Sequence, residues 1–360
     1  MFARNRTSFA LLSVSFILGV YLLRVALWGP IPLIGIPIDD GYERASGVVH
    51  VHTTLSDGGG TPEDVIAAAR RNDLDFVAIT DHNNLDAFPY AGYHGETLAL
   101  VGSELSTTVG HMLALGLEKD PGFRFSGNAT DGLVDIHDLG GFAFVAHPLS
   151  PRNDLQWSAT DLPGPWGIEI INGDNQWRRA GLRSITTLAL FQLNQPYTLL
   201  RIMTPPKDTL TYWDEMLEKR DVIGIFGADA HNRLPITDGW SLRFPSYDSL
   251  FSVAQNHLLL NNPLSGEADI DRALMLDALR EGRFYIGLDG LAPAGMFSFI
   301  IESKDARRWT MGQSVPYEPD LRVRAGGHVP VGAQIRLLRN GEVFAETLET
   351  LNIPLPGVGV

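Results

Sequence analysis

The stretch GVVHVHTT, residues 47–54, decides the fold because it joins a strand pattern to two closely spaced histidines. Apolar and polar residues alternate along it, and many are β-branched, which is typical of a β-strand. His50 and His52 stand two residues apart, so both imidazoles lie on one face of the strand and can share one ion. Asp57 follows in a glycine-rich loop. This strand end is therefore a candidate metal site.

Short apolar strands and helices alternate through the chain that follows. The pattern predicts strands at 76–80, 98–102, 142–146, 168–171 and 222–226, with helices at 65–72 and 269–282. Strands that are almost entirely apolar are typical of a parallel sheet buried on both faces. We therefore predict an α/β fold whose sheet closes into a barrel.

Further polar side chains come where these predicted strands end. They are Asp81, His82, Glu104, His147, Asp229 and His231, while His111 opens a further apolar stretch. The carboxyl ends of parallel barrel strands meet on one rim, so these side chains are expected to lie together. A lone histidine is usually structural, but six of the ten histidines stand at such positions, which favours a metal site. The other four, His94, His137, His257 and His328, are interpreted as structural or exposed.

In this order the residues resemble the PHP superfamily, named for polymerase and histidinol phosphatase. The similarity extends over 47–289 and rests on His50-x-His52, Thr80-Asp81-His82, Glu104, His111, Ala146-His147-Pro148 and Asp229-Ala230-His231. Residues 110–116, 213–217 and 278–283 are similar to the branch named for carbaryl hydrolases. The resemblance implies a distorted seven-stranded barrel that binds two or three divalent ions of zinc, manganese or iron.

The resemblance also implies which residues bind each ion. The first ion would be bound by His50, His52, Glu104 and Asp229, the second by Glu104, His111 and His147, and the third by Asp57, His82 and His231. Some members have histidine where Asp57 stands, so either two or three ions are expected. Water between two such cations loses its proton near neutral pH and becomes the nucleophile.

Several polar residues near the predicted strand ends are candidates for other roles. Asp81 and His231 are the predicted catalytic residues, and Asp81 either orients His82 or caps its strand. Glu169 is expected to support the rim without binding metal. Candidate substrate contacts are Arg152, Asn172 and Arg233, and Arg178 and Arg179 are further cations that a phosphate would need.

Composition narrows the reaction and the partners. A net charge of −14 opposes binding to nucleic acid, so a small-molecule substrate is expected. The absence of cysteine excludes thiolate ligands and a cysteine nucleophile. We expect hydrolysis of a small ester, carbamate or phosphoester. The alternatives are a phosphoesterase acting on phosphate monoesters or nucleotides, and a metal-loaded surface binding module without catalysis.

Residues 1–28 are interpreted as a signal anchor, a transmembrane helix, with a cleaved signal as the alternative. Arg4 and Arg6 precede an apolar run that spans a bilayer if Arg24 extends to the headgroups. Basic residues before such a run favour a cytoplasmic N-terminus. The catalytic domain is therefore expected to be extracytoplasmic, in the periplasm or at the cell surface.

The expected domain organisation has three further parts. A proline-rich spacer is predicted at 29–46, the metallohydrolase barrel at 47–290, and a small β module at 291–360. Within the module, strands are expected at 297–301 and 334–338, and Asn340-Gly341 predicts a hairpin turn. The module is expected to be incomplete at its C-terminal end.

Overall fold

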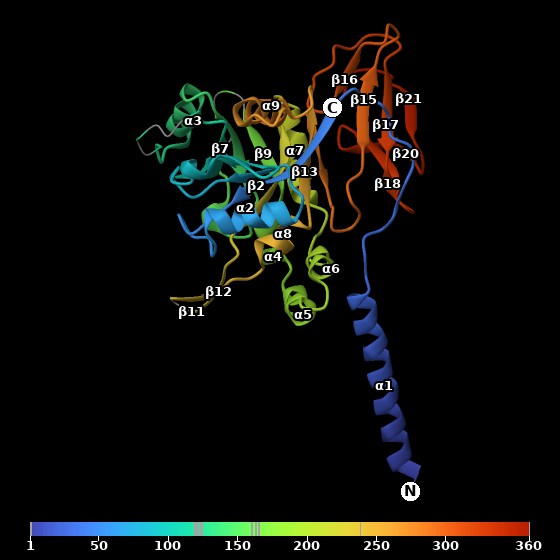
Figure 1. The fold of residues 1–360 in the computed structure, drawn as a ribbon. Coiled ribbons are helices and arrows are strands. Elements are labelled where there is room, and N and C mark those ends of the chain that lie inside the picture. Colours follow the sequence, from blue (N-terminus) through green and yellow to red (C-terminus); the bar gives the residue numbers. More distant parts are fainter. Residues whose placement is uncertain are drawn as a thin grey trace.

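The structure, a computed structural model, describes residues 2–118, 122, 125–159, 161–162, 164, 166–237 and 239–359. Figure 1 shows a long N-terminal helix, an α/β domain and a β module that follows it in the sequence. The α/β domain is built on an 11-stranded mixed sheet. This sheet positions the candidate site.

The sheet follows one path with two additional strands. In order, its strands are β4 (Gly92–His94), β5 (Thr97–Val101), β3 (Phe76–Ile79), β2 (Glu43–Val51), β10 (Gly224–Ala230), β9 (Gly167–Asn172), β8 (Phe142–Ala146), β7 (Gly110–Leu115) and β6 (Ser103–Thr107). β13 (Gln255–Leu260) pairs with β2, and β14 (Phe284–Gly287) pairs with β13. The six strands from β5 to β8 along this path are parallel neighbours.

The sheet is mixed rather than parallel throughout, which corrects the sequence prediction. β6 and β7 form an antiparallel hairpin, and β4, β13 and β14 are also antiparallel. Residues 103–115 are too few for a parallel crossover, whereas a short turn joins antiparallel strands. The sheet curls into a half barrel, and a parallel bridge between His82 and Glu104 links the end of β3 to β6. A closed barrel of seven strands stays a prediction.

Helices cover both faces of the sheet, as the apolar strands predicted. Val48 packs in one buried cluster with Val65 of α2 (Pro62–Arg71), whereas Val49 packs in another with Met275 of α9 (Ala268–Arg280). The other helices are α3 (Ala129–Asp138), α4 (Gly173–Arg179), α5 (Leu182–Leu190), α6 (Gln195–Leu200), α7 (Lys207–Leu217) and α8 (Tyr247–Phe251). Alternate residues of a strand point to opposite faces, so both faces of β2 become core.

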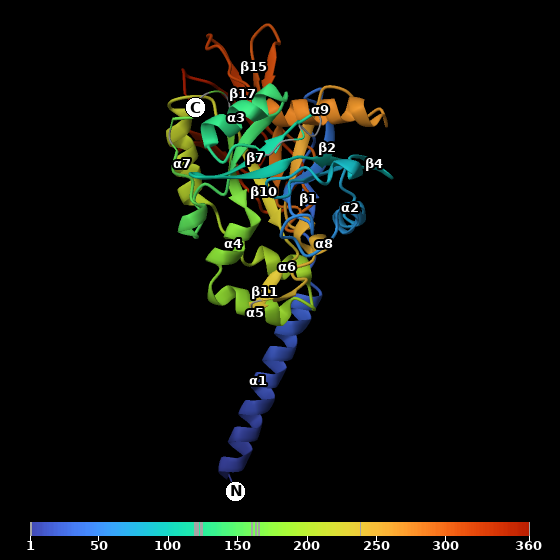
Figure 2. The same cartoon turned by 90° about the vertical axis from the view of Figure 1, so that its left-hand side faces the viewer.

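The N-terminal helix α1 (Phe2–Ala26) projects from one end of the domain (Figures 1 and 2). Its segment Phe9–Ala26 is long and apolar enough to span a membrane, a property that signal sequences share. The proline-rich segment after it is docked on the molecule. There β1 (Leu33–Ile34) pairs with β18 (Val329–Pro330) of the β module.

The β module has its own sheet and a small apolar core. The sheet order is β16 (Arg308–Thr310), β15 (Phe297–Glu302), β17 (Arg322–Gly327) and β21 (Leu351–Pro354). Val323, Ala325 and Leu351 form the buried cluster. Beside this sheet, β19 (Ile335–Arg339) and β20 (Glu342–Thr347) pair across Asn340 and Gly341, so the predicted hairpin is confirmed. Both turn residues have positive φ, 52° and 75°, as that turn requires.

Candidate metal centre

The structure brings all nine predicted metal ligands together at one rim of the sheet. They form four overlapping groups: His52, Asp57, His82 and His231; His50, His52 and Asp229; His50, Glu104 and His147; and His82, Glu104 and His111. Within each group the ligand atoms lie within 4.8 Å of one another. The rim predicted from the strand ends therefore gathers these side chains into one cluster.

The buried carboxylate of Glu104 lies at the centre of the cluster, with histidine nitrogens around both oxygens. Its Oε2 lies 3.1 Å from His50 Nε2, 3.1 Å from His52 Nε2 and 3.3 Å from His82 Nδ1. Its Oε1 lies 2.9 Å from both His111 Nδ1 and His147 Nε2. A carboxylate placed between two sets of imidazoles has the arrangement of a bridging ligand.

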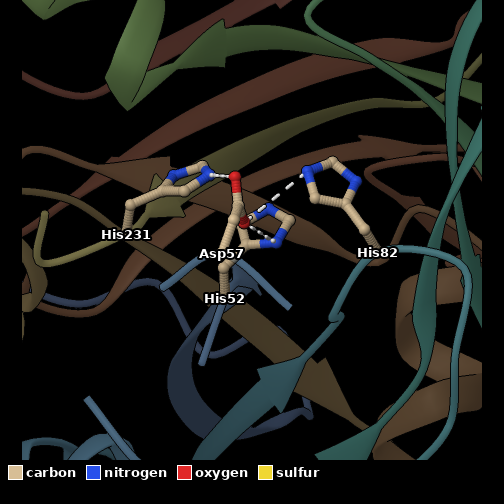
Figure 3. Close-up of side chains that lie close together, drawn as sticks. All are labelled: His52, Asp57, His82 and His231. Carbon is tan, nitrogen blue, oxygen red and sulfur yellow. Dashed lines mark ion pairs between the residues drawn. The ribbon is translucent and has the colours of Figure 1, made fainter. Parts of the chain in front are cut away.

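Two aspartates complete the cluster on the side of His231. Asp57 Oδ2 lies 3.3 Å from His231 Nε2, and its Oδ1 lies 3.6 Å from His52 and 3.7 Å from His82. In Figure 3 the three imidazole rings surround this carboxylate. Asp229 Oδ1 lies 3.3 Å from His231 Nδ1 and 3.5 Å from His50 Nε2. The aspartates thus connect two parts of the cluster: the group of His52, Asp57, His82 and His231, and the residues around Glu104, called the Glu104 group.

Several imidazole nitrogens in the cluster are buried without a hydrogen-bond partner among the described residues. They are His50 Nε2, both ring nitrogens of His52, His82 Nδ1 and His147 Nδ1. A buried polar atom without a partner is costly, and most such atoms in proteins are satisfied. Nitrogen and carboxylate ligands suit zinc, manganese and iron. The residues therefore fit the divalent ions expected from the sequence.

Glu169 supports the cluster from behind. Its Oε1 lies 2.6 Å from His50 Nδ1, which leaves Nε2 of the same ring facing Glu104. Its Oε2 accepts hydrogen bonds from the backbone N–H of His147 at 2.7 Å and from Asn172 Nδ2 at 2.8 Å. A carboxylate behind a histidine fixes the orientation of the ring and raises its basicity.

Asn172 is buried among the residues that support the cluster, which corrects its interpretation as a substrate contact. It is 4% exposed, and its Nδ2 donates to Glu169 and, at 3.0 Å, to Asp229 Oδ2. Its Oδ1 accepts from the backbone N–H of Asn175 and so caps α4. Every polar atom of this side chain is used to hold the site together.

Asp81 supports a loop rather than His82. Its carboxylate accepts hydrogen bonds from the backbone N–H and hydroxyl of Thr53, both at 2.7 Å, and from the Ser56 hydroxyl at 2.5 Å. These donors lie in the loop that carries Asp57. The interpretation that Asp81 orients His82 is therefore replaced, and Asp81 is a positioning residue for Asp57.

Three of the clustered residues adopt left-handed backbone conformations. The φ angles are 65° at His50, 32° at His147 and 48° at Asp229. Such conformations cost residues other than glycine roughly 1–3 kcal/mol each and are concentrated at functional sites. The strained backbone turns these three side chains toward Glu104 and one another. Nothing in the local sequence indicates this strain.

The carboxylates and imidazoles shift the pKa values of one another. Burial lowers the pKa of His147, but the surrounding carboxylates, Glu104 foremost with Asp229 and Glu169, together outweigh burial and raise the pKa to about 9. His231 is raised to a pKa of about 9 in the same way, chiefly by Asp57. Burial, together with repulsion from His231, lowers the pKa of His52 to about 4. His52 is therefore neutral at pH 7, which is the form that binds metal.

A cavity of about 490 Å³ opens onto the cluster. Its lining includes the metal-ligand candidates and three arginines, Arg152, Arg178 and Arg233. Arg152 pairs with Asp154, and Arg178 pairs with Asp174. Arg233 donates to the carbonyl of Asp57 at 3.1 Å and has no carboxylate partner within the described part of the chain. Arg179 lies outside the lining and donates to the Leu149 carbonyl.

Sequence reasoning missed two residues that shape the site. Tyr247 in α8 donates its hydroxyl to the carbonyl of His52 at 2.6 Å, but nothing in the sequence around it indicates this role. Gly227 lies beneath Glu169, and a Cβ at this position would lie 1.7 Å from Glu169 Oε1. A lone glycine inside a strand indicates a close approach, so Gly227 could have been found.

One segment of the chain matches a known domain family. Residues 49–123 match the PHP domain. The chain is 29% identical to an uncharacterized protein of Methanocaldococcus jannaschii over 121 residues, 29% of this chain and 67% of that protein. The match to the PHP domain begins just before His50 and extends past His111.

Two solved structures align with most of this chain at low sequence identity. One is a two-domain protein from Bacteroides vulgatus that contains a predicted PHP-like metal-dependent phosphoesterase, with 14% identity, 92% of each chain covered and a TM-score of 0.45. The other is PsfC from Pseudomonas syringae, with 13% identity, 70% of this chain and 94% of that chain covered, and a TM-score of 0.41. These likenesses are distant, so function has to be inferred from the side chains.

Proposed function

We propose that this protein is a metal-dependent hydrolase that cleaves a phosphate ester. The observation that carries the proposal is the Glu104 carboxylate, whose two oxygens lie within 3.3 Å of five imidazole nitrogens. Divalent ions bound there would polarise the scissile group and lower the pKa of a water molecule. We propose the ligand sets named from the sequence, with Asp57, His82 and His231 for a third ion.

The arginines of the cavity favour phosphate over a neutral carbamate or carboxyl ester. A phosphate ester is an anion, and guanidinium groups are well suited to bind its oxygens. Arg233 has the clearest role, because its charge is not neutralised by a carboxylate among the described residues. Asp174 pairs with Arg178, so that arginine is held in place at the cavity wall.

His231 stays the proposed catalytic residue that faces the substrate, whereas Asp81 acts only through Thr53 and Ser56. His231 lines the cavity and lies between Asp57 and Asp229. Its side chain can bind an ion or hold a proton at Nε2 beside Asp57. Replacement of His231 by glutamine should therefore lower turnover more than it lowers the metal content of the Glu104 group.

The test compares p-nitrophenyl phosphate with an aryl acetate and an aryl carbamate, using the full chain loaded with zinc or manganese. We expect the phosphate to be cleaved fastest and activity to be lost with a chelator. Glu104→Gln should abolish turnover, while His94→Gln, outside the cluster, should retain it. Activity that persists without metal would overturn the hydrolase proposal, and a preference for carbamate would reverse the substrate order. A metal-loaded protein inactive on all three substrates would favour the binding module.

We further propose that α1 anchors the protein in a membrane with the α/β domain on the extracytoplasmic side. The apolarity of Phe9–Ala26 supports the anchor, and Arg4 and Arg6 before it support the orientation. Protease added to cells with a permeabilised outer layer should digest the domain. Protection until the inner membrane is lysed would reverse the orientation. Release of the domain without detergent would indicate a cleaved signal.

A further inference from the structure

Large apolar side chains are exposed on the end of the α/β domain from which α1 projects. On α5, Leu182, Ile185 and Leu188 are 82%, 61% and 45% exposed, and their spacing places them along one side of the helix. α5 contains no acidic residue. Contiguous exposed apolar surface of this kind usually marks a contact with another molecule or a membrane.

A neighbouring hairpin adds to this surface. It consists of β11 (Leu234–Thr237) and β12 (Trp240–Leu242), in which Ile236, Trp240 and Leu242 are 46%, 56% and 44% exposed. The chain directly after β12 packs against the C-terminal end of α5, because the Phe244 ring centroid lies 4.6 Å from that of Phe191, which follows the last residue of α5. We call the exposed apolar side chains of α5 and this hairpin, together with Pro235 of β11, the apolar rim.

The apolar rim lies at the same end of the α/β domain as the C-terminal end of α1. Figures 1 and 2 both show α5 and β11 at the end of the domain from which α1 leaves. The helix is fixed there by α6, since Arg201 donates to the Tyr21 hydroxyl at 2.6 Å. Asn194 donates to the carbonyl of Trp28 at 2.8 Å. A bilayer around α1 would therefore meet the apolar rim.

The composition of the rim suits a membrane surface. Tryptophan is enriched where protein crosses between lipid and water, and Trp240 is the most exposed of the three apolar hairpin residues named above. Arg183 is exposed on α5 and has no carboxylate partner among the described residues, so it can face lipid phosphates. Apolar side chains flanked by a basic residue are typical of interfacial helices.

The cavity beside the metal cluster adjoins the apolar rim at Pro235. Pro235 of β11 lines the cavity, while Ile236 beside it is exposed on the rim. Arg233, just before β11, and Arg178 of α4 line the same cavity. The mouth of the cavity is thus next to the surface that a bilayer would cover.

We propose that the apolar rim enters the bilayer beside α1 and holds the cavity at the lipid headgroups, so that the substrate is a phosphate ester on a membrane lipid. The substrate part rests on the proposed phosphoesterase function. The membrane contact does not depend on it, because it follows from α1 and the rim alone. The two parts are therefore tested separately.

The first experiment places spin labels on single cysteines, which the cysteine-free chain allows without background. Full-length Leu182→Cys, Ile185→Cys and Trp240→Cys are reconstituted in phosphatidylcholine vesicles. Controls are Val134→Cys on α3 and Ile270→Cys on α9, which are exposed apolar residues away from α1 (Figure 1). We expect the three rim labels to be accessible to oxygen and protected from a water-soluble nickel complex. Equal nickel access at all five positions would overturn the membrane contact.

The second experiment measures phosphate release from phosphatidic acid in phosphatidylcholine vesicles, with p-nitrophenyl phosphate as the soluble substrate. The double variant Leu182→Asp, Ile185→Asp should lower turnover of the lipid by roughly tenfold, because carboxylates are excluded from the bilayer. Turnover of the soluble substrate should not change, and Ile270→Asp should leave both unchanged.

The outcomes separate the two proposals. If the soluble phosphate is cleaved but the lipid is not, or if the double variant loses both activities equally, the lipid substrate is wrong and the phosphoesterase stands. If neither phosphate is cleaved, the phosphoesterase and the lipid substrate fail together. The spin labels then still decide whether the rim contacts the bilayer.

Discussion

Substitution of Gly227 by alanine tests whether Glu169 positions the metal ligands. The new Cβ would lie 1.7 Å from Glu169 Oε1, far inside any tolerated contact, so the carboxylate has to move. That movement breaks the contact with His50 Nδ1 and the hydrogen bond from the His147 backbone. Loss of such a carboxylate behind a ligand lowers metal affinity by roughly 10–100-fold. Hydrogen bonds to a charged group contribute about 1.5–3 kcal/mol each to stability.

The assay is calorimetric zinc titration of the Gly227→Ala variant, combined with thermal unfolding of the metal-free protein. Gly127→Ala is the matched control, because its new Cβ has nothing within 4 Å and its φ is ordinary. We expect a lower zinc affinity for Gly227→Ala than for the wild type. Gly127→Ala should bind zinc with the wild-type affinity. Wild-type zinc affinity in a folded Gly227→Ala variant would refute the role of Glu169.

The remaining predictions concern the loop, the tyrosine and pH. Asp81→Asn should weaken the hydrogen bonds that Thr53 and Ser56 donate to this side chain and destabilise the protein by about 2 kcal/mol. Metal binding should weaken first at the site that includes Asp57 and only later at the sites that include Glu104. Metal titration would check this order. Tyr247→Phe should cost about 1 kcal/mol in chemical unfolding, since it leaves the His52 carbonyl without its donor. The pKa values of His147 and His231 are about 9 in the metal-free fold, above the ordinary 6.5, so the stability that their protonation supplies is present below about pH 6.5. It should be lost as pH rises through 9, seen as a falling melting temperature, whereas metal-loaded protein should show no such loss because metal replaces these protons. A melting temperature of metal-free protein that rises over this range would contradict the assignment.

The sequence predicted the parts of the fold that depend on local pattern. Apolar runs such as Phe142–Ala146 became buried strands, and the helix predicted at 65–72 is part of α2. The ligands could be named because most of them lie at or near the ends of strands whose positions the sequence indicates. The β6–β7 hairpin was missed because an apolar run does not reveal whether its neighbour is parallel.

Roles set by contacts between distant segments could not be read from the sequence. Asp81 is next to His82 in the chain, yet its partners Thr53 and Ser56 lie in another loop. Asn172 was expected at the substrate, but the fold turns it onto Glu169 and Asp229. The positive φ of His50 could not be predicted either, because residues adjacent in the sequence do not indicate it.

The most direct test of the account is anomalous X-ray scattering at the metal absorption edge from crystals of the zinc- or manganese-loaded protein. We predict at least two peaks, one beside each oxygen of Glu104, because that carboxylate lies between His50 and His52 on one side and His111 and His147 on the other. In the Glu104→Gln variant, both peaks should weaken or disappear. No peak among these side chains, in a protein shown to carry metal, would contradict the account.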